Sequence, residues 1–151
     1  MFSKIRDNLF LSGVDDITKE KIAQNNIDII LNVSLDCKTP EIKNVEIIRI
    51  GFDDDAKIAE KEAQPAIDFL CEKLKSGNIV LVHCRKGASR SPHIVASVLS
   101  IIENKDYDEI YKEIRGLHPR TMAYSIGQEI KELPKNKLDQ LFKVFGGKNN
   151  V

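Results

Sequence analysis

Hydrophobic and polar positions along the chain fall into two kinds of segment. Short apolar runs rich in β-branched residues predict buried strands at 27–34 (IDIILNVS), 45–52 (VEIIRIGF) and 78–84 (NIVLVHC). A shorter strand is expected at 8–11 (NLFL). The run at 78–84 is the most apolar of them, so we expect it at the centre of a sheet.

The second kind of segment has apolar residues at helical spacing. Ile67, Leu70 and Leu74 would lie on one helix face, and prolines at 65 and 92 stand where a first helical turn tolerates them. Asp106 and Glu109 have the spacing of a capping box. The first helix is predicted from a cap at Asp15 or Asp16 to about Gln24. Further helices are predicted over 62–75, 91–104 and 107–116, the last of them closed by Gly116 and Pro119. A final helix is predicted over 123–145, with a break at Pro134.

Strands joined by helical crossovers predict an α/β fold: a three-layer sandwich with a central, mostly parallel sheet flanked by helices. The length of 151 residues suits one domain with a substantial core. We therefore expect a single domain over 1–145 and a flexible polar tail over 146–151.

Charge and composition narrow the possible partners. The 23 basic and 23 acidic residues cancel, which gives no electrostatic reason to expect nucleic acid as a partner. No apolar run is long enough to cross a bilayer, and the first residues do not look like a secretory signal. Three widely spaced cysteines favour a reducing, cytoplasmic location, and the absence of a coiled-coil pattern favours a monomer.

The chemistry concentrates in residues 81–92, LVHCRKGASRSP. A buried strand that ends at Cys84 and turns into a helix near Arg90 directs backbone N–H groups and the positive end of the helix dipole at one point. Gly87 allows the sharp bend, and Arg90 can bind two phosphate oxygens through its planar fork. The same positive environment favours the nucleophilic thiolate of Cys84, so the segment combines a nucleophile with an anion-binding loop.

These residues resemble a known family. The segment HCRKGASRS is similar to the His-Cys-x5-Arg-Ser/Thr signature of the cysteine-dependent protein tyrosine phosphatases. The stretches IRDNLFLSG, IDIILNVS and IIRIGFDDD are similar, in order and spacing, to the compact dual-specificity branch of that superfamily. The resemblance covers roughly residues 4–130.

The resemblance implies an enzyme that hydrolyses phosphate monoesters through a phosphocysteine, with no cofactor. Cys84 would be the nucleophile, and Ser91 would hydrogen-bond the sulfur and help the thiolate leave. His83 would orient the loop and support the thiolate. The phosphoryl oxygens would be held by the Arg90 side chain and by the backbone amides of Arg85, Lys86, Gly87, Ala88, Ser89 and Arg90.

A general acid must also protonate the leaving oxygen. The resemblance places it in GFDDDAK, and alignment of the preceding strand favours Asp54. Asp53 and Asp55 stay open because a slip of one residue would select either. Crowding of three carboxylates would favour the protonated form of one of them.

The substrate is less defined than the reaction. The resemblance and the compact length favour phosphorylated proteins as partners, with phosphotyrosine and also phosphoserine or phosphothreonine as targets. Arg85 and Lys86 add two cations at the loop, which leaves a phosphoinositide or an RNA 5′-triphosphate as the alternative. A non-catalytic phosphate-binding module is the remaining hypothesis.

The other cysteines and histidines have weaker signals. Cys37 could be a resolving thiol for Cys84, although an unpaired loop cysteine is the favoured interpretation. Cys71 lies in a helical apolar stripe and indicates core packing. His93 and His118 are expected to be structural or exposed, and no Cys/His pair has zinc spacing, so no metal is predicted.

Overall fold

The computed structural model describes residues 1–134; the predicted helical segment beyond Pro134 and the tail at 146–151 lie outside this part. The described chain alternates strands and helices as predicted. In chain order its elements are β1 (Phe2–Arg6), β2 (Leu9–Gly13), a 3₁₀ turn (Val14–Asp16), α1 (Lys19–Gln24), β3 (Ile29–Asn32), β4 (Glu46–Arg49), α2 (Ala56–Glu62), α3 (Gln64–Lys75), β5 (Val80–Cys84), α4 (Arg90–Glu103), α5 (Tyr107–Leu117) and α6 (Ile126–Glu132).

The sheet has five strands in the order β1-β2-β5-β3-β4. Strand β5 pairs in parallel with both β2 and β3, and β3 pairs in parallel with β4. Only β1 is antiparallel, as the outer strand of a hairpin with β2. The predicted central place of the strand that carries Cys84 is therefore confirmed, and the carboxyl ends of β2, β3 and β5 meet at one edge.

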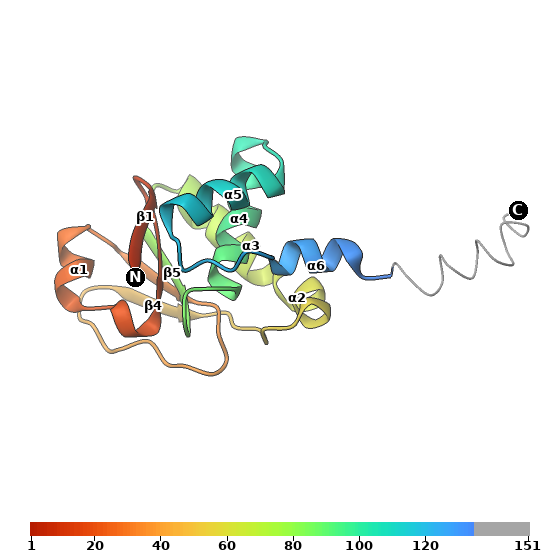
Figure 1. Ribbon diagram of the computed structural model, residues 1–151. Helices are drawn as coiled ribbons and strands as arrows, with labels where there is room; N and C mark the ends of the chain where they lie inside the picture. Colours follow the sequence, from red (N-terminus) through yellow and green to blue (C-terminus); the bar gives the residue numbers. More distant parts are fainter. Residues whose placement is uncertain (135–151) are drawn as a thin grey trace, which may run out of the picture.

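Alternation along the strands divides the core into two layers. Leu9, Leu11 and Val82 belong to the larger cluster, which helices α3 to α6 cover, whereas Phe10 and Leu81 face a smaller cluster that includes Ile22 of α1. Figure 1 shows α1 on one side of the sheet and α3, α4 and α5 on the other. This is the three-layer α/β sandwich that the sequence pattern predicts.

Three details differ from the sequence predictions. The first is β1, whose sequence FSKIR mixes polar and apolar residues and carries little strand signal, but which is fixed by pairing with β2. The second is the cap of α1: Thr18, not Asp15 or Asp16, accepts from the Lys21 N–H, because both aspartates lie in the 3₁₀ turn before it. The third is β4, which was expected to be buried and is mostly exposed because it forms the sheet edge.

The prediction of one helix over 62–75 also misses a second, shorter helix that precedes it. The structure has two helices here, α2 and α3, which meet at Ala63. Pro65 lies in the first turn of α3, as expected. Helix α5 continues through Gly116 to Leu117, so Pro119, rather than Gly116, marks its end. Among residues 1–134, no helix combines the length and apolar character that crossing a membrane requires.

The side chain of Asp55 begins α2. It accepts hydrogen bonds from the backbone N–H groups of Lys57 at 2.9 Å and Ile58 at 3.3 Å. Asp55→Ala should therefore lower the free energy of unfolding by about 1 kcal/mol, measured by urea denaturation. An unchanged free energy of unfolding in this variant would show that the cap does not stabilise α2.

Candidate active site

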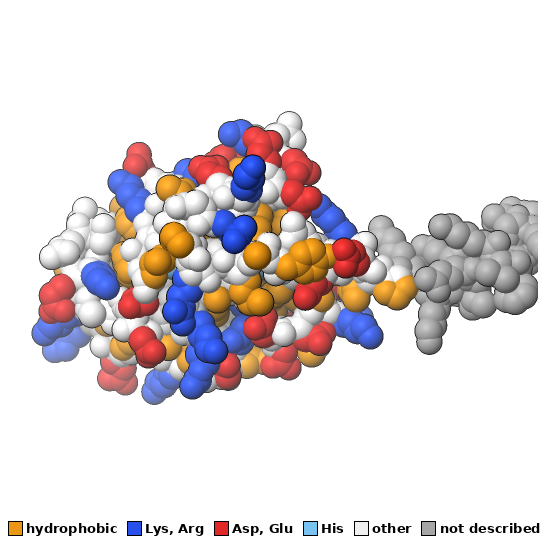
Figure 2. All heavy atoms as spheres, viewed as in Figure 1, with side chains coloured by type: hydrophobic (Ala, Val, Ile, Leu, Met, Phe, Trp, Pro, Cys, Tyr) orange, Lys and Arg blue, Asp and Glu red, His pale blue; other side chains and the backbone are white. Residues whose placement is uncertain are grey.

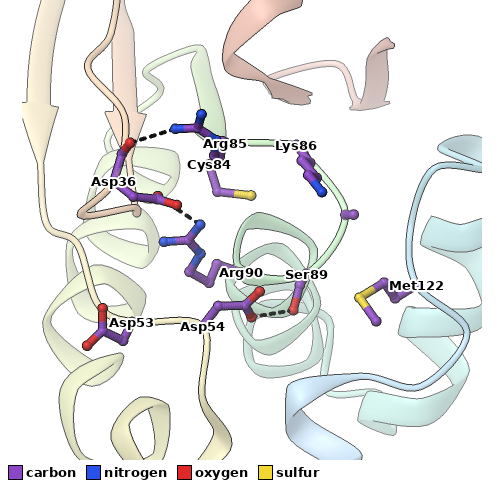
Figure 3. Close-up of a pocket in the computed structure, with 10 residues that line it drawn as sticks. Asp36, Asp53, Asp54, Cys84, Arg85, Lys86, Ser89, Arg90 and Met122 are labelled. Atoms are coloured by element: carbon purple, nitrogen blue, oxygen red, sulfur yellow. Dashed lines mark hydrogen bonds and ion pairs between the residues drawn. The ribbon is translucent and has the colours of Figure 1, made fainter.

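The site lies where β5 ends and α4 begins. Cys84 is the last residue of β5, Arg90 is the first of α4, and the five residues between them form a loop at the carboxyl edge of the sheet. A pocket of about 570 Å³ opens at this loop, and Figure 3 shows Cys84 and Arg90 directed into it. The cap residue Ser89 makes no side-chain bond to the first turn of α4, so the N–H groups of that turn remain available to an anion.

Four successive carbonyl groups of the loop accept hydrogen bonds from residues outside the loop. The Val14 N–H binds Arg85 O at 3.0 Å and the Met122 N–H binds Ala88 O at 2.9 Å. Side chains hold the two carbonyls between them: Arg120 Nε donates to Lys86 O, and His118 Nε2 lies 2.9 Å from Gly87 O. In a trans peptide the next N–H points opposite to the carbonyl, so the amides of residues 86–89 point toward the pocket. None of these four N–H groups has an acceptor among residues 1–134.

Two glycines let the loop lie this close to the sheet. Gly87 has a φ of +70°, as its predicted bend requires, and a Cβ there would lie 2.6 Å from the backbone N of Gly13. A Cβ on Gly13 would in turn meet the Lys86 backbone at 2.7 Å. Gly13 ends β2 and carries no catalytic signal in the sequence, yet only a glycine fits beneath the loop.

Cys84 and Ser91 form the predicted contact. Their side-chain sulfur and oxygen are 3.1 Å apart, Cys84 is 2% exposed and Ser91 is fully buried. A thiolate can only accept, so the Ser91 hydroxyl would donate to the ionised sulfur. The first turn of α4 holds this hydroxyl at the base of the pocket.

The guanidinium of Arg90 is buried and held by neighbours that lie far away in the sequence. Nη1 donates to Phe52 O at 3.4 Å, and Nη2 donates to Asp36 Oδ1 at 3.0 Å. The Nε atom is buried and has no hydrogen-bond partner within the described residues. A buried unpaired donor is costly, and a phosphoryl oxygen in the pocket would satisfy it.

The three aspartates after β4 lie in different environments. Asp54 lines the pocket, and Ser89 Oγ donates to its Oδ1 at 2.7 Å, while Oδ2 has no hydrogen-bond partner within residues 1–134. Asp53 also lines the pocket, but Figure 3 shows its side chain directed away from Cys84. Asp55 is engaged as the cap of α2. The geometry thus favours Asp54 among the three alternatives.

His83 sits behind the nucleophile and is neutral at pH 7. Burial lowers its pKa to about 4. Its Nδ1 lies 3.1 Å from Cys84 O, which only accepts, so Nδ1 carries the hydrogen and Nε2 accepts from Thr39 Oγ1 at 2.7 Å. These two bonds fix the His83 ring beside the end of the strand, and any support for the thiolate comes without a positive charge on the ring.

Two buried histidines give a pH prediction. Burial lowers the pKa of both His83 and His93 to about 4, whereas an unfolded histidine titrates at about 6.5. The unfolded chain therefore takes up protons that the folded protein excludes, so stability is present above about pH 6.5 and is lost as pH falls toward 4. Between about pH 7 and pH 5 we expect each histidine to remove on the order of 2 kcal/mol from the free energy of unfolding.

Urea denaturation across this pH range measures the effect. His93 contacts Tyr107 rather than the phosphate loop, so His93→Gln should reduce the slope of stability against pH by about half of the two-histidine contribution. An unchanged slope in that variant would show that His93 is not excluded from protonation in the folded state.

Of the other residues considered from the sequence, Arg85 and Lys86 line the pocket, whereas Cys37 and Cys71 do not. Arg85 donates to the backbone O of Asp36 at 2.8 Å, and Lys86 lines the rim without an ion pair among the described side chains. Cys37 contacts Ser34 Oγ through its sulfur and is not among the pocket residues. Cys71 is half-buried against the larger core cluster, as expected.

The residues that hold the Arg90 and His83 side chains are not predicted from the sequence: Asp36, Phe52 and Thr39. Asp36 and Thr39 belong to the loop after β3, and Phe52 follows β4. Their only sequence signal is position, because the loops after parallel strands share the edge of the sheet that carries the nucleophile.

The central strand, the terminal cysteine and the loop that leads into a helix define the fold and site of a cysteine-loop phosphatase domain. Residues 9–129 match the family model described as dual specificity phosphatase, catalytic domain, and the chain belongs to this family.

Relatives with known sequences agree with this family. The chain is 32% identical to human Dual specificity protein phosphatase 16 over 123 residues, which are 78% of this chain and 18% of that protein. It is 23% identical to Dual specificity protein phosphatase 22-A of Danio rerio over 141 residues, which are 91% of this chain and 67% of that protein. The chain therefore spans less than a fifth of the human relative and about two thirds of the fish one.

Solved structures show the same fold. The crystal structure of DUSP15 aligns with a TM-score of 0.73 and 21% identity, over 96% of this chain and 97% of that one. The crystal structure of human DUSP28 aligns with a TM-score of 0.74 and 18% identity, over 87% of this chain and 90% of that one.

Proposed function

We propose that this chain hydrolyses phosphate monoesters on proteins, phosphotyrosine and also phosphoserine or phosphothreonine, through a phosphocysteine at Cys84. The observation that carries the proposal is the buried Nε of Arg90, which has no partner among residues 1–134 and belongs to a side chain that lines the same pocket as Cys84 and the four loop amides without acceptors in that range. Such a cluster of donors matches the oxygens of a phosphoryl group.

The first step transfers the phosphoryl group to sulfur. The Cys84 thiolate attacks phosphorus, the P–O bond to the substrate breaks, and Asp54 gives its proton to the leaving oxygen. The loop amides and Arg90 hold the three non-bridging oxygens as their charge redistributes. The products of this step are the dephosphorylated side chain and the phosphocysteine.

The second step restores the enzyme. Asp54, now a carboxylate, accepts a proton from water as the water oxygen attacks phosphorus and the P–S bond breaks. The Ser91 hydroxyl donates to the departing thiolate, which its 3.1 Å distance to the sulfur supports. Inorganic phosphate leaves the pocket.

The charges around the pocket favour a phosphoprotein over a polyanion. Arg85 and Lys86 add positive charge at the rim, but Asp36, Asp53 and Asp54 line the same pocket. Acidic and basic side chains are also interspersed over the face in Figure 2. A triphosphate or polyphosphorylated lipid headgroup would bring extra negative charge close to these carboxylates, whereas a single phosphorylated side chain would not.

We propose further that the chain acts as a single-domain monomer in the cytoplasm, without a cofactor. The three cysteines are free thiols, which suits a reducing compartment. The continuous core that joins the sheet to α3, α4 and α5 supports one folding unit.

A panel of substrates tests this function. Phosphotyrosine and phosphothreonine peptides, phosphoinositide vesicles and 5′-triphosphate RNA are assayed for phosphate release by the wild-type chain and by Cys84→Ser. We expect peptide turnover that Cys84→Ser abolishes. Faster turnover of the lipid or RNA would transfer the proposal to that substrate, and phosphopeptide binding without any turnover would indicate a non-catalytic module.

The general acid has its own test. Asp54→Asn keeps the size of the side chain but cannot donate the proton, so kcat on a phosphothreonine peptide should fall roughly 100-fold or more. An aryl phosphate with a strongly electron-withdrawing ring needs less protonation and should be less affected. The matched variant Asp53→Asn should remain within a few-fold of wild type in the same steady-state assay. Equal loss in both variants would contradict the assignment of Asp54.

A further inference from the structure

His118 lies behind the phosphate-binding loop and is fully buried. Its ring joins two distant parts of the chain: Nδ1 is 2.7 Å from Ser3 Oγ in β1, and Nε2 is 2.9 Å from Gly87 O in the loop. The ring therefore connects the edge hairpin of the sheet to the loop that holds the nucleophile.

The partners fix the hydrogen on the His118 ring. A backbone carbonyl can only accept, so Nε2 carries the hydrogen and donates to Gly87 O. In the neutral ring Nδ1 then accepts from the Ser3 hydroxyl. Burial lowers the pKa of His118, which favours this neutral form.

The bond to Gly87 O sets the direction of the next amide. Gly87 C=O and the Ala88 N–H belong to one peptide unit, and the described chain has no cis peptide bond. With the carbonyl turned toward His118, the Ala88 N–H points the opposite way, into the pocket that Ala88 lines. A rotation of this peptide would remove one donor and present a carbonyl oxygen to the anion.

Among the peptides of the loop, the Gly87–Ala88 peptide depends most on a hydrogen bond from outside the loop to keep its orientation. Gly87 has a φ of +70° and no side chain, so its own sterics restrict rotation less than those of any other loop residue. Arg120, the other side chain that holds a loop carbonyl, is exposed, whereas the bond from His118 is buried and shielded from competing water.

We propose that His118 is a positioning residue for phosphate binding, which fixes the Gly87–Ala88 peptide so that the Ala88 N–H points at a tetrahedral oxyanion. This inference rests on the proposed function of the loop as a phosphate site. It assigns no contact between His118 and the substrate, because Gly87 lies between them.

Two polar variants of similar size separate this role from simple packing. In His118→Gln the side-chain amide nitrogen reaches the place of Nε2 and can still donate to Gly87 O. In His118→Asn the shorter amide reaches only the place of Nδ1 and leaves Gly87 O without its donor. Tungstate and inorganic phosphate binding are measured on the full chain by calorimetry, together with kcat and KM on an aryl phosphate.

We expect His118→Asn to weaken tungstate binding about tenfold and to lower kcat/KM by a similar factor, while His118→Gln stays within about threefold of wild type. His93→Asn, at a second buried histidine whose side chain contacts Tyr107 instead of the loop, should lower stability without changing anion affinity. Equal affinities in the Asn and Gln variants would overturn the proposal.

The test also works if a histidine variant does not fold. Ser3→Ala keeps the Nε2–H donor and removes only its second partner, so it should weaken tungstate binding by no more than a few-fold; a loss as large as tenfold would contradict the assigned donor. Anion binding does not require turnover. If the chain bound tungstate normally but hydrolysed no substrate, the proposed function would be contradicted, and the tungstate affinities of the His118 variants would still test the role of His118.

Discussion

Cys84→Ser should abolish phosphopeptide turnover, lowering kcat by roughly 10⁴-fold or more in a steady-state phosphate-release assay. A serine hydroxyl in this pocket stays protonated near neutral pH, so the attacking anion is lost while the size of the side chain is nearly kept. The loop amides and Arg90 remain in place, so tungstate binding should persist.

Cys71→Ser is the matched control for this variant. Cys71 lies in α3, half-buried against the core, and does not line the pocket. Its replacement should leave kcat/KM within about twofold of wild type. Substantial turnover by Cys84→Ser, or a comparable loss in Cys71→Ser, would show that the reaction does not depend on the sulfur at the loop.

Arg90→Lys should lower kcat/KM by roughly 10³-fold. Lysine keeps the positive charge but has no planar fork, so it cannot bind Phe52 O and Asp36 on one side while it offers a further donor to the phosphoryl group on the other. Steady-state kinetics and tungstate calorimetry measure the two consequences.

The control for Arg90→Lys is Arg115→Lys, an exposed arginine in α5. It should leave both kcat/KM and tungstate affinity unchanged. If Arg90→Lys retained most of its activity, the unpaired Nε could not be a main phosphate donor, and the observation that carries the proposed function would lose its meaning.

The parts of the fold that the sequence predicts are those with strong, continuous patterns. Strand β5 is apolar except for His83, and α4 keeps helical periodicity after Pro92, so the predicted bounds of both lie close to the observed ones. Strand β1 is short and half polar, and its formation depends on pairing with β2 rather than on its own composition. Tertiary contacts of this kind leave little trace in a local pattern.

Edge position explains the error at β4. Its residues are apolar enough to suggest burial, but its place at the end of the strand order leaves most of its side chains exposed. Helix α2 was not predicted because the run of three aspartates was interpreted only as a source of the general acid. One of them, Asp55, is instead the N-cap of this helix, which is a common role for aspartate.

The residues of the candidate site likewise fall into those that a local pattern predicts and those that only tertiary contacts bring together. Cys84, Arg90 and Ser91 lie in one segment, so a strand that ends in a loop and a helix is enough to bring them together. Asp36 is separated from Arg90 by 54 positions and joins the site only because β3 pairs with β5. His118 reaches the loop from the end of α5, and no spacing rule connects it with Gly87.

Ser91→Ala should make a phosphocysteine at Cys84 directly observable. Without the Ser91 hydroxyl the thiolate should leave slowly, so the second step becomes rate-limiting and the intermediate accumulates. Rapid mixing with an aryl phosphate should give a burst of about one phenol per protein, and peptide mass spectrometry of the quenched sample should place one phosphoryl group on Cys84. Turnover with no burst and no adduct, or a phosphoryl group on any other residue, would contradict the account.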